Sequence, residues 1–221
     1  MNIKSLGILG LGSRSTLFYI RELNRLYHEK KAGYSTCPFK LWNVNFDPIN
    51  KLLPQSSKKL EVLILNCIVE LQQMKIDALL IPNITFHETV DALDLKINII
   101  HPVVLVIAEL KKQGIEKVVL FGSLHSMETD YIKGNFKKEG IEVLLPSKED
   151  RILIDTVRKN IYAETETPEL LKQYNNTVVK YTEFYPVVLA CTELSIAWND
   201  ANGNVYDMAR TQIRIIIDNM D

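Results

Sequence analysis

Hydrophobic and polar positions along the chain follow two alternating periods. Short apolar runs closed by polar turns predict strands at residues 3–9, 41–46, 77–81, 97–100, 117–122, 141–145, 186–190 and 204–207. The segments between these runs carry apolar residues at helical spacing, as in residues 59–74. Strands that alternate with helices along the whole chain predict an α/β fold with parallel sheets.

The pattern starts again near residue 103. A strand, a Gly-Ser loop and a helix occur at residues 117–128 as they do at residues 3–20. We therefore predict two pseudo-symmetric lobes, each a parallel sheet flanked by helices. The predicted first lobe comprises residues 1–102 with 204–221, and the second comprises residues 103–203. No charged or low-complexity linker separates them, which favours an extensive interface over a tether.

Polar side chains stand directly after two of the predicted strands. Cys191, Thr192 and Glu193 follow the strand at 186–190, and Asn83 begins a polar turn after the strand at 77–81. Ligands bind beyond the carboxyl ends of strands in parallel sheets, so Cys191 is a candidate for chemistry. The alternative is packing, since free cysteine is often buried as a small apolar residue.

A glycine turn leads from the first strand into a helix. Residues 10–16 read GLGSRST, and unpaired N–H groups at such a helix start favour an anion. We expect Gly12, Ser13 and Arg14 to contribute, because the guanidinium fork matches a carboxylate. The GxGxxG dinucleotide pattern lacks its last glycine, where Ser15 stands, so a tight turn or a solvated arginine is the alternative. Ser15 or Thr16 is expected to cap the helix.

Composition limits the class of partner. The 221 residues are 47% hydrophobic and 24% charged with a formal net charge of -1, which argues against a general nucleic-acid binder and favours small molecules. No apolar run approaches the ~18 residues of a membrane span, and the first strand meets its glycine turn too early for a signal peptide. We expect a cytoplasmic protein. Its three cysteines lack zinc-site or CxxC spacing, so no metal is predicted.

These motifs together resemble the aspartate/glutamate racemase family over nearly the whole chain. The matching pieces are Gly7-Ile8-Leu9-Gly10 with Ser15-Thr16, Pro82-x-x-Thr85-x-His87, Gly122-Ser123 with Ser126-Met127-Glu128, Glu149-Asp150-Arg151, Cys191-Thr192-Glu193-Leu194, and Asp207. The resemblance implies a racemase that needs no cofactor, pyridoxal phosphate included, and is usually a homodimer. It also implies a dicarboxylic amino acid or related acid in a cleft between the lobes, with one thiol from each lobe facing the α-carbon.

This chain departs from the family pattern in its first lobe. Asn83 stands where the first thiol is expected, and an amide does not exchange a proton near neutral pH. Ile84, Leu124 and Met208 also replace expected polar residues. The resemblance leaves Cys191 as the surviving acid/base thiol.

Other polar residues near these strand ends complete the predicted site. Thr85 is a weak surrogate proton carrier with His87 as the nearby base, although His87 at a helix start can instead bond to backbone. Ser126 and Thr192 are candidate ligands of a substrate carboxylate, each with helix capping as its alternative. Glu193 is a candidate to tune Cys191 or to bind the substrate ammonium group, with helix capping as the alternative.

Three functions follow from these observations. The leading hypothesis is an aspartate/glutamate-type racemase, an isomerase. Because only one thiol is retained, a single-thiol decarboxylase or isomerase of the same superfamily is the alternative. A non-catalytic protein that binds small acids is the third.

Overall fold

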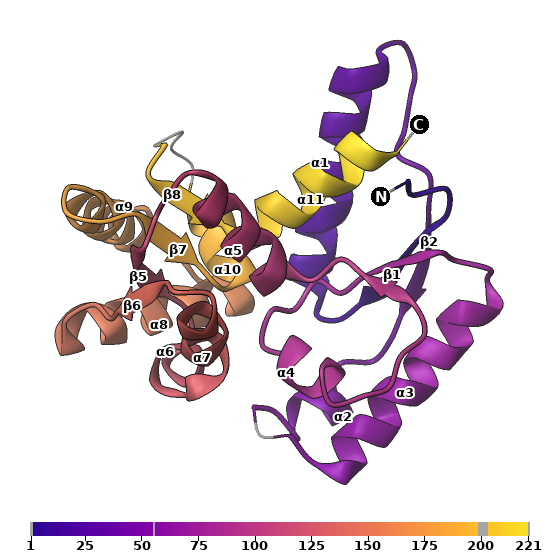
Figure 1. Ribbon diagram of the computed structural model, residues 1–221, viewed down its shortest axis with the longest axis horizontal. Helices are drawn as coiled ribbons and strands as arrows, with labels where there is room; N and C mark the ends of the chain where they lie inside the picture. The colour runs from indigo at the N-terminus through magenta and orange to yellow at the C-terminus, as the bar shows by residue number, and fades with distance from the viewer. Residues whose placement is uncertain (1, 55, 199–202, 221) are drawn as a thin grey trace. The chain divides into compact units, whose positions relative to one another are not determined.

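The computed structural model describes residues 2–54, 56–198 and 203–220 (Figure 1). Among these residues the strands form two four-stranded sheets with the orders β2-β1-β3-β4 and β6-β5-β7-β8, and every strand pair is parallel. Helices flank both sheets. The predicted α/β class with two repeated parallel sheets is therefore confirmed.

The chain divides into two compact units. Unit 1 is Met1–His101 with Gln212–Asp221, and unit 2 is Pro102–Thr211. The elements that begin in unit 1 are β1 (Leu6–Gly10), α1 (Ser13–Lys31), β2 (Phe39–Asn43), α2 (Asp47–Asn50), α3 (Lys58–Gln73), β3 (Ala78–Leu80), α4 (His87–Val90) and β4 (Asn98–Ile99).

The elements that begin in unit 2 are α5 (Pro102–Lys112), β5 (Lys117–Phe121), α6 (Leu124–Glu128), α7 (Asp130–Lys138), β6 (Glu142–Leu144), α8 (Lys148–Ala163), α9 (Pro168–Thr182), β7 (Val187–Leu189), α10 (Thr192–Ala197), β8 (Val205–Asp207) and α11 (Met208–Asn219).

The C-terminal segment divides between the two units, whereas the sequence prediction placed all of it in the first lobe. Residues 204–221 were all assigned to the first lobe, but Val187 pairs with Val205 and Leu189 with Asp207, so β8 is a strand of the second sheet. Only the segment from Gln212 onward lies in unit 1. Backbone pairing decides the placement of a short strand, and its sequence does not reveal its partner. Residues 1, 199–202 and 221 of the predicted lobes lie outside the described residues.

Each unit has its own apolar core. In unit 1, apolar residues of α3 pack with those at the end of β1 and with Phe86. In unit 2, residues of β5 and β7 pack with α8, α9 and Leu194 of α10. Both cores therefore support the carboxyl ends of the first and third strands in their sheets, where the candidate side chains follow.

A buried hydrogen-bond chain ties α11 into unit 1, where α1 and α11 run side by side (Figure 1). The Tyr19 hydroxyl donates to Gln212 Oε1 at 2.5 Å, and Gln212 Nε2 donates to the carbonyl of Ile100 at 2.5 Å. Tyr19 and Gln212 are fully buried. Because both polar atoms of the Gln212 amide are paired, this residue is accommodated in the interior.

Two helices begin earlier than the sequence predicts, within segments expected to be loops. The first helix begins at Ser13 rather than near Thr16, with Gly12 as its N-cap at φ 75°. That left-handed φ favours glycine and explains why the helix starts directly after it. The Gly-Ser loop predicted within residues 117–128 leads at once into α6, whose N-cap Ser123 accepts a hydrogen bond from the N–H of Ser126. No helix among the described residues is long and apolar enough to span a membrane.

Candidate active site

Cys191 lies two residues beyond β7 and is the N-cap of α10. Its backbone is extended (φ -158°, ψ 132°), and its carbonyl accepts the N–H groups of Leu194 at 3.1 Å and Ser195 at 3.2 Å. The thiol takes no part in this capping. Backbone bonds thus fix the residue and leave its sulfur for other contacts.

The Cys191 thiol donates a hydrogen bond to Glu193 (Cys191 Sγ to Glu193 Oε2, 2.8 Å). Burial raises the pKa of Cys191 well above its ordinary value, and the charge and hydrogen bond of Glu193 raise it further. The resting thiol is therefore protonated.

Thr192 and Ser126 are the other unit 2 residues proposed from the sequence. Thr192 is buried, and its Oγ1 has no hydrogen-bond partner in the described part of the chain. Ser126 is also buried, and its hydroxyl lies 2.9 Å from the hydroxyl of Ser123. A Cβ on Gly122 would stand 3.1 Å from Cβ of Ser126, so glycine allows this close approach of α6 to β5.

In unit 1 the first turn of α1 carries Gly12, Ser13 and Arg14. This helix start has neither a capping side chain nor an acidic residue in its first turn. Thr16 in the same turn is buried, with its Oγ1 unpaired among the described residues. A helix start of this kind favours an anion, and a carboxylate would satisfy its N–H groups.

Asn83 lies three residues beyond β3, and its side chain caps its own turn. Asn83 Oδ1 accepts the N–H of Phe86 at 3.2 Å, and its carbonyl oxygen lies 3.0 Å from Nδ1 of His87. Thr85 in this turn is partly buried. A thiol at position 83 would be a poorer acceptor for the Phe86 N–H, so asparagine has a local structural role here.

His87 is fully buried at the start of α4. Its Nδ1 faces a carbonyl, which only accepts, so Nδ1 carries the proton. The ring packs edge-on against His101 at 4.8 Å, and His101 Nε2 lies 3.2 Å from Oδ1 of Asp91. Burial, followed by the charge of His101, lowers the pKa of His87 to about 3. His87 therefore supports the Asn83 turn as a neutral ring and is a poor base.

A charged cluster on α8 was not predicted from the sequence. Arg158 Nε donates to Oδ1 of Asp155 at 2.8 Å, and Lys159 Nζ lies 2.7 Å from Oδ2 of the same carboxylate. Arg158 interacts electrostatically with Cys191 and Glu193. The sequence signal was present, because Arg158 falls on the apolar stripe of its helix, where a charge is uncommon.

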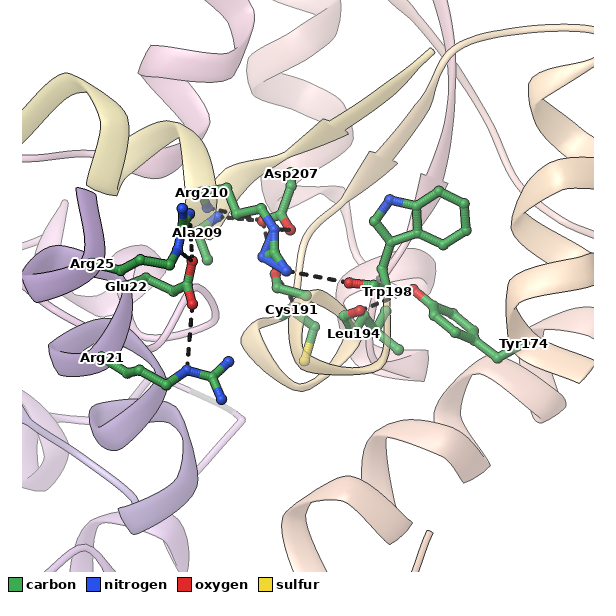
Figure 2. A network of polar contacts seen from close by, with 11 residues as sticks. Arg21, Glu22, Arg25, Tyr174, Cys191, Leu194, Trp198, Asp207, Ala209 and Arg210 are labelled. Atoms are coloured by element: carbon green, nitrogen blue, oxygen red, sulfur yellow. Dashed lines mark hydrogen bonds and ion pairs between the residues drawn. The ribbon is translucent and has the colours of Figure 1, made fainter. Parts of the chain in front are cut away.

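A second buried network joins α10 to the start of α11 (Figure 2). Ser195 Oγ donates to Oδ1 of Asp207 at 2.8 Å, and the same oxygen accepts the N–H groups of Ala209 and Arg210. Burial raises the pKa of Asp207. Asp207, which belongs to the motifs noted in the sequence, thus anchors the start of α11 next to α10.

The structure brings the predicted residues together within each unit. Cys191, Thr192 and Glu193 share the start of α10, and Asn83 shares one turn with His87. β3 and β7 hold the same place in the two sheet orders. No group of three or more His, Cys, Asp or Glu that could hold a metal occurs in residues 2–54, 56–198 and 203–220.

Comparison with known proteins identifies the family. The Asp/Glu/hydantoin racemase family matches residues 8–216, so the chain belongs to this family. The resemblance seen in the sequence is confirmed.

Solved structures show the same fold. A Yersinia pestis protein assigned as an Asp/Glu racemase is 23% identical with a TM-score of 0.82, and the match covers 99% of this chain and 98% of that one. An aspartate racemase homologue from Pyrococcus horikoshii OT3 is 22% identical with a TM-score of 0.82, covering 97% and 98%. Picrophilus torridus aspartate racemase is 19% identical with a TM-score of 0.77, covering 97% and 93%. At these identities the similarity is one of fold.

Proposed function

We propose that the protein is an aspartate/glutamate-type amino-acid racemase that works without pyridoxal phosphate and uses Cys191 as its acid/base thiol. The observation that carries the proposal is the thiol beyond β7, which donates to the carboxylate of Glu193 at 2.8 Å. As a thiolate, Cys191 takes the α-proton of the substrate, and as a thiol it returns one. Membership of the racemase family supports this chemistry.

Each unit, taken by itself, has candidate partners for a carboxylate. The uncapped start of α1 supplies N–H groups from its first turn, which includes Ser13 and Arg14. In unit 2, Thr192 offers a buried hydroxyl with no partner among the described residues. Spreading the carbanion charge onto a carboxylate held by such donors lowers the barrier to proton removal. The substrate class is therefore a dicarboxylic amino acid.

The bonded state of Asn83 favours a second candidate. Its amide oxygen is engaged by Phe86, so position 83 is built as a turn cap and carries no proton to the second face of the α-carbon. A single-thiol enzyme of the decarboxylase or isomerase type then remains, in which Cys191 protonates a carbanion from one side. A true racemase would need Thr85, or a water held by Asn83, on the other face.

Proton exchange measured beside inversion tests these candidates. Each enantiomer of aspartate and glutamate is incubated in heavy water, and α-deuterium and the D/L ratio are followed together. A two-base racemase couples exchange to inversion, whereas one base on one face gives exchange that outpaces inversion. Because the pKa of Cys191 is raised, both rates should increase with pH through the neutral range.

Cysteine variants provide the controls. Cys191→Ser should abolish exchange, and Cys67→Ser, which changes a thiol on α3, should leave it intact. Neither exchange nor inversion in the wild type would defeat the racemase proposal for these substrates. Stabilisation by dicarboxylates in a thermal-shift assay, without turnover, would favour the non-catalytic binder.

Two further properties are proposed: a homodimer, which rests on family membership, and a cytoplasmic location. Light scattering tests the first, and the mass of a single 25.3 kDa chain at micromolar concentration would contradict it. Cell fractionation tests the second, and recovery outside the cytosolic fraction would contradict it.

A further inference from the structure

Arg158 occupies an unusual position on α8. The buried residues Ile154, Val157 and Ile161 form the apolar stripe of this helix, and Arg158 lies within the same stripe. Its side chain is 26% exposed, whereas that of its neighbour Lys159 is 64% exposed. Burying most of a guanidinium costs free energy unless anionic groups surround it, so this position calls for an explanation.

Asp155 holds the guanidinium in place. This carboxylate, whose side chain is 5% exposed, accepts Arg158 Nε at 2.8 Å and the N–H of Leu124 at 3.3 Å. No other side-chain hydrogen bond of Arg158 occurs in the described part of the chain. Asp155 therefore fixes one edge of the guanidinium and leaves its two terminal amino groups for other anions.

Two ionisable groups, Cys191 and Glu193, lie at the start of α10. Helix α8 packs against α10, and the positive charge of Arg158 interacts with both Cys191 and Glu193. It lowers the pKa of Cys191, against the larger upward effects of burial and of Glu193. The charge of Arg158 thus favours the thiolate, whereas burial and the charge of Glu193 favour the protonated thiol.

The remaining charged groups near Cys191 do not duplicate this role. Tyr174 on α9 is buried, and burial followed by the negative charge of Asp207 raises its pKa well above the ordinary value, so it stays neutral. Arg210 lies 3.7 Å from Oδ2 of Asp207, which offsets its charge. Among the described groups, Arg158 is the cation with the largest effect on the thiol.

We propose that Arg158 is a positioning residue for Cys191: clamped by Asp155, its guanidinium places a positive charge against the Cys191–Glu193 pair and makes the thiol easier to ionise. The role deepens the proposed function, on which its consequence for turnover rests. It also explains why a cation lies on a core-facing stripe.

Thiolate absorbance near 240 nm, titrated with pH, tests the proposal without turnover. Subtracting the curve of a Cys191→Ser protein isolates Cys191 from the other two thiols, and the same subtraction is made in each variant background. Arg158→Met should move the Cys191 titration upward by about one pH unit or more, because an opposite charge nearby is worth about 1–3 units. Arg158→Lys should restore part of this shift.

Lys159→Met is the matched control. Lys159 bonds to the same carboxylate but is exposed, so its loss should leave the titration within about 0.3 units of wild type. Identical curves for Arg158→Met and Lys159→Met would overturn the proposal. If Arg158→Met does not fold, Arg158→Gln, which keeps hydrogen-bonding groups but removes the positive charge, should give the same upward shift, and no shift would overturn the proposal.

The outcome separates this inference from the proposed function. A shifted thiol titration in a protein that turns over neither aspartate nor glutamate would refute the racemase and retain the role of Arg158. Racemisation with no change in titration between wild type and Arg158→Met would do the reverse.

Discussion

Acidification should destabilise the protein through His87. The folded-state pKa of this ring is about 3, against an ordinary value of 6.5, so the unfolded chain binds the proton more tightly. The contribution of neutral His87 to stability is complete above about pH 6.5 and is lost progressively as the pH falls toward about 3. At pH 5 the pH lies roughly 1.5 units below the ordinary pKa of histidine. Proton binding to the unfolded chain then lowers the free energy of unfolding by about 2 kcal/mol.

The charges around His87 set the conditions of this test. His101 packs on the ring and pairs with Asp91, and both groups influence the His87 charge. His87→Asn keeps an N–H donor near the Nδ1 position for the Asn83 carbonyl but cannot be protonated. The variant therefore retains the other titrations and loses that of His87.

Urea unfolding at pH 7.5 and pH 5.0 measures the effect. The wild type should lose about 2 kcal/mol more than His87→Asn between these two pH values. In thermal melts the same difference corresponds to about 4–8 °C for a chain of this size. Parallel losses in the two proteins would refute the reasoning, because they would show that the buried ring accepts a proton as readily as an unfolded one.

Three further substitutions test other contacts. Asn83→Cys should remove the cap on the Phe86 N–H and lower the free energy of unfolding in urea by about 1 kcal/mol. If a second thiol completes the site, the variant should also raise inversion relative to exchange in heavy water. An unchanged ratio of inversion to exchange would argue against a proton-transfer role for this position. Tyr19→Phe should cost about 1–3 kcal/mol in the same assay, because it leaves Oε1 of Gln212 buried and unpaired; a loss near zero would contradict this. Asp207→Ala should cost about 1–2 kcal/mol and Asp207→Asn clearly less, since asparagine also caps helices; equal losses would show that the cap is unimportant.

Much of the fold could be predicted because the hydrophobic period changes at nearly every element. The strands from β1 to β8 and the long helices all coincide with predicted segments within a few residues. The strand that pairs with β8 could not be predicted, because the sequence of a three-residue strand does not indicate which strand lies beside it. Short α10 was also missed, because its six residues are too few to show a period.

The candidate site was predictable where chemistry follows a strand end directly. Cys191 and Glu193 are two positions apart in sequence, so their hydrogen bond could be anticipated from one motif. Arg158 lies more than thirty positions earlier and reaches the site only through the packing of α8 against α10. The capping role of Asn83 was likewise hidden, because a missing thiol says nothing about which bond its replacement makes.

The division of α11 between the units bears on how the chain is made. Unit 2 is one continuous stretch, Pro102–Thr211, whereas unit 1 needs both the first hundred residues and the segment from Gln212 onward. During synthesis unit 2 can complete its core before unit 1 does. The Tyr19 hydroxyl has its acceptor, Gln212 Oε1, only after another 193 residues have been made. The N-terminal unit emerges first from the ribosome and is the last to be finished.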